Sequence, residues 1–369
     1  MRRLWLIYTL LFYLPFFLSG QESGFGWEIG TGFFIKHNPE ITFDVQQPMP
    51  FAEAKYIWQS NPHQSWARYH RYPKIYMAAR AQFLGVQATT GWSFALYPSL
   101  DIPIMNRSSG NFSFVVGSGL SYHTKYFDPI GNVQNNAIGS AWNNISRFQL
   151  KYSFPFFKMG TAAVAAGFNH LSNGATQSPN RGINSWSLSI EWQDVHFRKE
   201  SPQEPADISV KPWIFKKWYW DVQWSTGIRE DKTPLGPKYY VYSLQTDVVY
   251  AFDPIQRWRL GIEWERNMQL VDFYSRQWQT ENRSEALQLG SSWSIYIADE
   301  FVFGPTSVTI LLGYLWDSGY TGIPIYNKLA FRYYFSFGKD QNKDLYATVV
   351  LKSRLATAEY IALGIGYRL

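Results

Sequence analysis

The stretch "NFSFVVGSGLSY" (residues 111–122) alternates between apolar residues and small or polar ones. In a β-strand, residues i and i+2 project from the same face, so this stretch predicts a strand with one apolar face. The same pattern recurs in "NSWSLSIEWQ" (residues 184–193) and in "EYIALGIGYRL" (residues 359–369). Segments of about ten residues with this alternation are typical of β-barrels whose outer wall meets lipid.

The composition supports a barrel in a membrane. Aromatic residues make up 19% of the 369-residue chain, a richness that soluble cores rarely need and that membrane barrels place in interfacial girdles. Cysteine is absent, which excludes disulfides, thiolate metal sites and a lipoprotein anchor. The net charge of +6 comes without a Lys/Arg run or a nucleic-acid motif, so we expect no nucleic-acid partner.

The N-terminal segment, residues 1–20, predicts a signal peptide. Two arginines precede an apolar run from Leu4 to Leu18, and small residues follow it. The alternative is a transmembrane anchor, but the run is shorter than the roughly 20 residues that span a bilayer, and it contains Pro15. We therefore expect export, and location in the outer membrane of a Gram-negative cell.

Alternating runs divide the chain into two halves. About eight strands are predicted in residues 21–194, the sixth beginning near Asn136, and about eight more in residues 218–369. Between the halves, residues 195–217 are polar, charged and contain prolines. Because barrel turns on the periplasmic side are normally short, a linker of this length favours two tandem barrels over one larger barrel. The predicted fold class is therefore an all-β, antiparallel transmembrane barrel, followed by a second barrel-like region.

Candidate chemistry lies in the stretch "HLSNGATQSPNRGIN" (residues 170–184). His170 and Ser172 stand two residues apart and share a strand face, which the pattern of the neighbouring residues assigns to the outer wall. Asn184, across the hairpin, shares the face of Trp186 and is also directed outward. A hydroxyl beside an imidazole is the arrangement of a nucleophile and its general base. The same residues could equally be polar groups at the end of a strand.

This stretch resembles the active-site hairpin of the PagL-type lipid A deacylases, often described as acyloxyacyl hydrolases. The resemblance rests on His-x-Ser-Asn followed by Pro-Asn-x-Gly, and it covers roughly residues 24–194. "GWSFALYPSLDIPI" (residues 91–104) and "FDPIGNVQNNAIGSAWN" (residues 127–143) are similar to the longer, two-part members. The resemblance implies an eight-stranded outer-membrane barrel that hydrolyses an ester-linked acyl chain of lipopolysaccharide, with lipid A as substrate.

The resemblance also implies a role for each residue of the hairpin. Ser172 would be the nucleophile and His170 its general base, at a site near the outer leaflet. Asn173 would contribute to the oxyanion hole, together with backbone N–H groups near Gly174 and Ala175. No cofactor is implied.

One position departs from the family pattern. Where better-known members carry Glu as the partner of the histidine, this chain has Asn184. An amide oxygen can accept the imidazole N–H and hold the tautomer, but it cannot offset the charge of the imidazolium. Glu191 is no replacement, because it lies on the opposite strand face and about 23 Å farther along the strand.

Rival interpretations remain open at this stage. Asn184 favours a non-enzymatic barrel with a structural or transport role, and the same Ser and His could also serve a phospholipase-like esterase. The remaining histidines show no ligand spacing, so no metal site is predicted.

Overall fold

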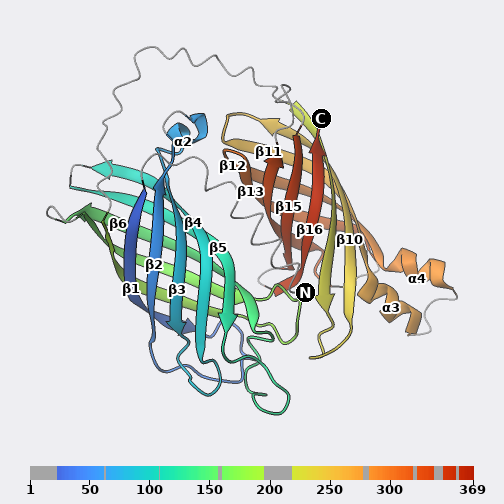
Figure 1. The fold of residues 1–369 in the computed structure, drawn as a ribbon. Helices are drawn as coiled ribbons and strands as arrows, with labels where there is room; N and C mark the ends of the chain where they lie inside the picture. The colour runs from blue at the N-terminus through green and yellow to red at the C-terminus, as the bar shows by residue number, and fades with distance from the viewer. Residues whose placement is uncertain are drawn as a thin grey trace.

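The computed structural model describes residues 23–61, 64–107, 109–156, 160–194, 218–276, 282–318, 322–335, 344–354 and 357–369. The strands form two closed barrels, which Figure 1 shows side by side, blue to green and yellow to red. The all-β fold class and the tandem arrangement predicted from the sequence are thus confirmed. The predicted signal peptide and linker lie outside the described residues.

The first barrel consists of eight antiparallel strands, each hydrogen-bonded to the next along the chain. It closes where β1 pairs with β8, with Ile29 opposite Ile190. Its strands are β1 (Ser23–Ile35), β2 (Met49–Gln59), β3 (Lys74–Phe83), β4 (Trp92–Arg107), β5 (Gly110–His123), β6 (Trp142–Pro155), β7 (Thr161–Ser172) and β8 (Ile183–Gln193).

The sixth strand begins at Trp142 and not near Asn136. Asn136 Nδ2 donates to the Glu40 carbonyl at 2.6 Å, and Asn135 Nδ2 donates to the Thr89 carbonyl at 2.8 Å. Asparagine side chains that bind backbone groups in this way compete with strand pairing. The segment before β6 therefore joins the loops at the mouth of the barrel.

The second barrel repeats the architecture and closes where β16 pairs with β9. Its strands are β9 (Trp218–Glu230), β10 (Lys238–Ala251), β11 (Gln256–Asn267), β12 (Ser291–Phe303), β13 (Thr306–Ser318), β14 (Ile325–Phe335), β15 (Asp344–Arg354) and β16 (Thr357–Arg368).

Three short helices lie in the described loops: α2 (Ser65–Tyr69) between β2 and β3, and α3 (Met268–Arg276) and α4 (Arg283–Leu289) between β11 and β12. No helix in the described ranges is long and apolar enough to cross a membrane.

Side chains alternate between the outer wall and the interior. In β8, Trp186, Leu188 and Ile190 are each more than half exposed (61%, 58% and 58%), whereas Ser187 and Glu191 are buried. The outer wall is therefore apolar along this strand, and the polar residues between face inward, as the period of two predicts.

The interior of each barrel is filled by paired charges. In the first barrel, Lys55 Nζ lies 2.6 Å from Glu191 Oε2. In the second, Arg259 lies 2.8 Å from carboxylate oxygens of both Asp221 and Glu300. Buried charges are tolerated when they are paired in this manner. Glu191 thus belongs to the interior network and takes no part in the outer wall.

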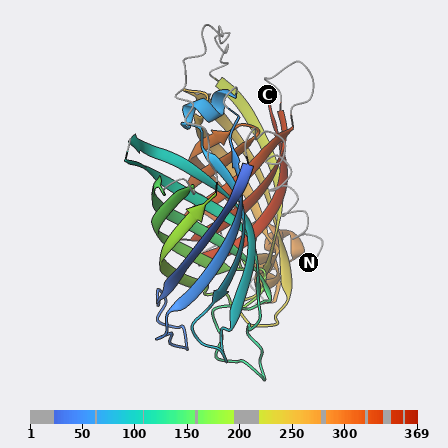
Figure 2. The same cartoon turned by 60° about the vertical axis from the view of Figure 1, so that its left-hand side comes forward.

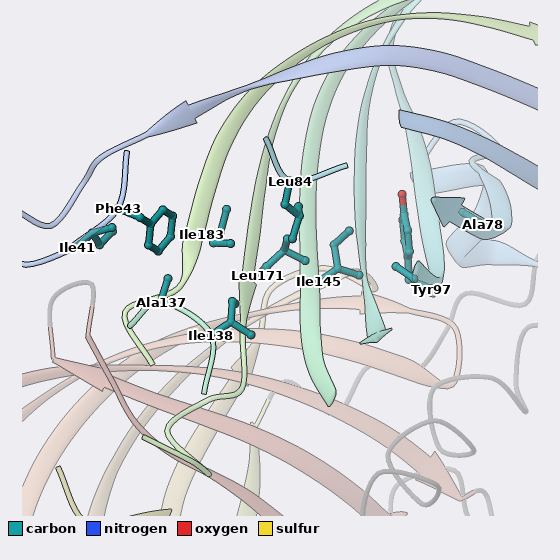
Figure 3. Packing of buried hydrophobic residues seen from close by; sticks show 11 residues of the cluster. Ile41, Phe43, Ala78, Leu84, Tyr97, Ala137, Ile138, Ile145, Leu171 and Ile183 are labelled. Atoms are coloured by element: carbon teal, nitrogen blue, oxygen red, sulfur yellow. The ribbon is translucent and has the colours of Figure 1, made fainter. Parts of the chain in front are cut away.

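An apolar cluster closes one mouth of the first barrel (Figure 3). Residues from the β1–β2 and β5–β6 loops pack there onto inward-facing residues at the ends of β7 and β8. The cluster contains Ile41, Phe43, Ala78, Leu84, Ala95, Tyr97, Ala137, Ile138, Ile145, Leu171 and Ile183. We call this mouth, where β7 ends and β8 begins, the site rim.

The two barrels contact each other at both ends. At the end opposite the site rim, His70, which follows α2, stacks on Phe303 with ring centroids 4.5 Å apart. Figures 1 and 2 both show α2 beside the end of the second barrel. At the site rim, the β7–β8 loop (residues 173–182) contacts the end of β9, with Glu230 N donating to the Ala175 carbonyl at 3.0 Å.

Candidate active site

Strand pairing at the site rim brings the predicted site residues together. His170 in β7 is paired with Asn184 in β8, and Leu171 is paired with Ile183. Leu171 and Ile183 point inward into the apolar cluster, where each is almost completely buried. Because neighbouring residues alternate, His170, Ser172 and Asn184 must project from the outer wall.

These three side chains form one hydrogen-bonded chain. His170 Nδ1 lies 2.5 Å from Asn184 Oδ1, and His170 Nε2 lies 2.8 Å from Ser172 Oγ. When Nδ1–H donates to the amide oxygen of Asn184, Nε2 carries the lone pair and accepts the hydroxyl hydrogen of Ser172. This is the geometry in which a base can remove a proton from a hydroxyl nucleophile.

Asn173 is fully buried and organises the loop that follows the serine. Its Nδ2 donates to the Gln177 carbonyl at 2.8 Å and to Ser140 Oγ at 3.2 Å. Its backbone N–H donates to Asn180 Oδ1 at 2.9 Å. The donors of the Asn173 side chain are thus engaged within the rim, where they hold the loop in place.

The next two residues turn the backbone sharply. Gly174 and Ala175 both have φ of +65°, in the left-handed region. Alanine adopts this conformation at a cost, because its Cβ approaches the following carbonyl oxygen. Among the described residues, the N–H groups of Gly174 and Ala175 enter no backbone hydrogen bond outside the strands. Both N–H groups belong to the backbone two and three residues after Ser172.

Three polar residues that the sequence reasoning did not single out lie next to this chain on the outer wall. Ser146 in β6 is paired with His170, and Ser118 in β5 is paired with Ser146. Asn144, paired with Ser172, donates its Nδ2 to Ser118 Oγ at 3.0 Å and accepts from Ser146 Oγ at 2.9 Å.

We call Ser118, Asn144 and Ser146 the polar row. Along β6 the later outward positions are Phe148, Leu150 and Tyr152, so polar residues at 144 and 146 interrupt an apolar face. This break in the apolar face of β6 was the feature of the sequence from which the polar row could have been predicted. Polar groups on a wall of this kind are costly unless they are hydrogen-bonded, and these three side chains bond one another.

No group of three or more His, Asp or Glu side chains arranged to hold a metal ion occurs within the described ranges.

Comparisons with known families match both halves of the chain. Residues 50–193 match the family model described as lipid A 3-O-deacylase (PagL), and residues 218–369 match the model described as acyloxyacyl hydrolase, C-terminal domain. No curated protein matches the sequence.

Several solved structures resemble the chain. The outer membrane enzyme PagL is 17% identical with a TM-score of 0.32, covering 46% of this chain and 99% of that one. A mutant form of Rh. blastica porin is 10% identical with a TM-score of 0.20, covering 94% and 99%. The KdgM porin is 6% identical with a TM-score of 0.18, covering 93% and 97%.

Proposed function

Since the chain belongs to the PagL family of lipid A deacylases, in a two-part form with an acyloxyacyl hydrolase C-terminal domain, we propose that it removes an ester-linked acyl chain from lipid A. The observation that carries this proposal is the hydrogen-bonded chain from Ser172 through His170 to Asn184 on the outer wall of the first barrel.

In the proposed reaction, Ser172 Oγ attacks the ester carbonyl while His170 Nε2 takes its proton. The tetrahedral intermediate then collapses to an acyl-enzyme, and His170 returns the proton to the departing alcohol of lipid A. Water, deprotonated by His170, attacks the acyl-enzyme and releases the fatty acid and the free hydroxyl of Ser172. Nucleophilic catalysis of this kind divides one difficult displacement into two easier steps.

The developing oxyanion needs donors that are already in place. We assign this role to the backbone N–H groups of Gly174 and Ala175, with Asn173 as the residue that holds the loop. Loss of one such donor typically lowers kcat by about 10²–10³-fold. The geometry of the loop therefore bears on the rate of the proposed reaction.

Asn184 determines how fast the reaction runs. Its amide oxygen accepts from Nδ1 at 2.5 Å and so selects the tautomer with a basic Nε2. It carries no charge, so it does not stabilise the imidazolium that forms when Ser172 is deprotonated. We therefore expect slower turnover than a carboxylate at this position would allow.

The placement on the outer wall fits a substrate held in the membrane. Outward residues below the site, such as Val164 and Leu188, are about half exposed and apolar. In the proposal these residues face outer-membrane lipid, the site rim lies at the outer leaflet, and the acyl chain of lipid A runs along this wall. The polar row then lies level with the ester, where it contacts hydroxyl groups of the substrate.

Mass spectrometry of lipid A from cells with and without the gene tests the function. The expected result is loss of one acyl chain that depends on the gene and is abolished by Ser172→Ala. Unchanged lipid A together with gene-dependent lysophospholipid would point to a phospholipase. No gene-dependent change in either lipid would indicate the non-enzymatic barrel that Asn184 favours.

A further inference from the structure

A buried carboxylate of the second barrel lies at the edge of the candidate active site. Glu230 ends β9 at an outward-facing position, on the same face as Trp218, Trp220 and Trp224. Those tryptophans are 42–59% exposed, whereas Glu230 is only 5% exposed. A carboxylate on an apolar outer wall is costly unless it is hydrogen-bonded. The hydrogen-bond partners of Glu230 therefore indicate its role.

The partners of Glu230 belong to the β7–β8 loop of the first barrel. The Ser178 N–H donates to Glu230 Oε2 at 2.5 Å, and the Glu230 N–H donates to the Ala175 carbonyl at 3.0 Å. One residue of the second barrel therefore holds the loop at two points, three residues apart.

Two further hydrogen bonds reinforce this attachment. Ser178 Oγ donates to the Asp231 carbonyl at 2.6 Å, and Lys238 Nζ donates to the Thr176 carbonyl at 3.0 Å. Both Asp231 and Lys238 adjoin the β9–β10 turn. The loop is thus attached to the second barrel by polar contacts along residues 175–178.

An apolar contact fixes the loop beside the nucleophile. A Cβ at Gly174 would lie 3.4 Å from Ile361 Cβ in β16 and 3.6 Å from Leu351 Cδ1 in β15. Gly174 therefore packs directly against the outer wall of the second barrel. Its position, two residues after Ser172, is where the oxyanion donors of the proposed reaction lie.

The contacts act on a segment whose backbone is strained at Ala175. Ala175 has φ of +65°, which residues with a Cβ rarely adopt. Such conformations persist when the surrounding structure holds them, and they cluster at functional sites. The carbonyl of Ala175 is the atom to which the Glu230 N–H is bonded.

From these contacts we infer that the second barrel is a positioning unit for the active site. Glu230 is its positioning residue: it holds residues 174–178 so that the Gly174 and Ala175 N–H groups point to the developing oxyanion. This inference rests on the proposed esterase function and adds a role for the second barrel in it. Glu230 does not touch the substrate, and it acts through the loop.

The test compares four full-length variants with the unmodified protein on a p-nitrophenyl acyl ester in detergent micelles. Glu230→Ala removes the acceptor for Ser178 N–H, whereas Glu230→Gln keeps an oxygen that can accept it. Asp272→Asn is the matched control, since Asp272 lies in α3 at the same end of the second barrel and bonds Tyr239 Oη at 2.6 Å. Ser178→Ala provides a second probe from the first barrel, without altering the second.

Glu230→Ala should lower kcat by about 10- to 100-fold with KM within about twofold, because a displaced donor weakens binding of the transition state and not of the substrate. Glu230→Gln and Asp272→Asn should stay within about threefold of the unmodified protein, and Ser178→Ala should lose several-fold. Labelling of Ser172 by a fluorophosphonate should be slower in Glu230→Ala but reach full stoichiometry. A merely unfolded fraction would instead lower the final stoichiometry.

A wild-type kcat in Glu230→Ala, or an equal loss in Asp272→Asn, overturns the positioning role while leaving the esterase function intact. A near-normal rate in Glu230→Gln shows that the hydrogen bond to Ser178 N–H, and not the negative charge, holds the loop. A rate in Glu230→Gln as low as that of Glu230→Ala also counts against the inference. If the unmodified protein hydrolyses no ester, both the function and the inference built on it fail.

Discussion

Gly182 lies directly against the imidazole of His170. A Cβ at this position would lie 2.8 Å from His170 Cε1, closer than such atoms approach, and the backbone there has φ of +75°. Gly182→Ala should therefore push the ring away from Ser172 and lower kcat by about 10²-fold, as small misplacements at a reacting centre do. Steady-state hydrolysis of a p-nitrophenyl ester measures this.

The control for that variant is Gly131→Ala. Gly131 lies in the β5–β6 loop, where a Cβ would meet only Asp128, at 3.5 Å or more. The Gly131→Ala variant should hydrolyse the ester at the rate of the unmodified protein. Equal rates for both alanine variants would show that the ring of His170 is not held by this contact.

Ser172→Ala and His170→Ala should each abolish deacylation, with losses of at least about 10³-fold, because nucleophile and base act as one unit. Both side chains project from the outer wall, so the barrel should remain folded. Release of fatty acid from purified lipopolysaccharide gives the rate, and heat-modifiable gel migration reports the fold. Ser189→Ala, an interior serine on the neighbouring strand, serves as control. Near-normal activity in both site variants would place the chemistry elsewhere.

Asn184 offers a test in both directions. Asn184→Ala should lower the rate because it frees the imidazole, whereas Asn184→Glu should raise it because a carboxylate offsets the charge of the imidazolium. The gain should not exceed about 10⁴-fold, the usual loss when a triad aspartate becomes asparagine. Turnover at neutral pH measures both. If Asn184→Glu brings no gain and Asn184→Ala no loss, Asn184 is not the residue that orients His170.

The polar row should contribute to substrate selection. Asn144→Leu removes the side chain that joins Ser118 and Ser146, and it extends the apolar wall. We expect it to lower kcat/KM for 3-hydroxyacyl esters about tenfold, the effect of losing one hydrogen bond to substrate, and to spare unsubstituted acyl esters. Paired p-nitrophenyl esters with and without the hydroxyl give the comparison. An unchanged ratio, with lipid A hydrolysis also unchanged, would assign the row no part in binding.

A chain truncated after residue 195 should still form a barrel. The β1–β8 pairing closes the first sheet without any strand from the second half. The truncated protein should show a β-type circular dichroism spectrum and heat-modifiable migration, with a kcat below that of the full chain because Glu230 is missing. Recovery only as aggregate would show that the first barrel needs the second in order to fold.

Much of this protein follows from a period of two in its sequence. The alternation around Trp186 and Leu188 assigned the outer wall, and the same parity placed His170, Ser172 and Asn184 on it, as the structure has them. Such local patterns are readable because each strand meets the same two environments along its whole length, an apolar wall and a polar interior.

The tertiary structure decided what lies around those residues. Whether Asn144 and Ser146 adjoin His170 depends on the register between β6 and β7, which the alternation limits to one parity but does not specify. The contact between Glu230 and Ser178 joins two barrels across 52 residues of sequence. No periodicity encodes it, because it depends on how two separately closed sheets pack, and each sheet satisfies its own backbone without the other.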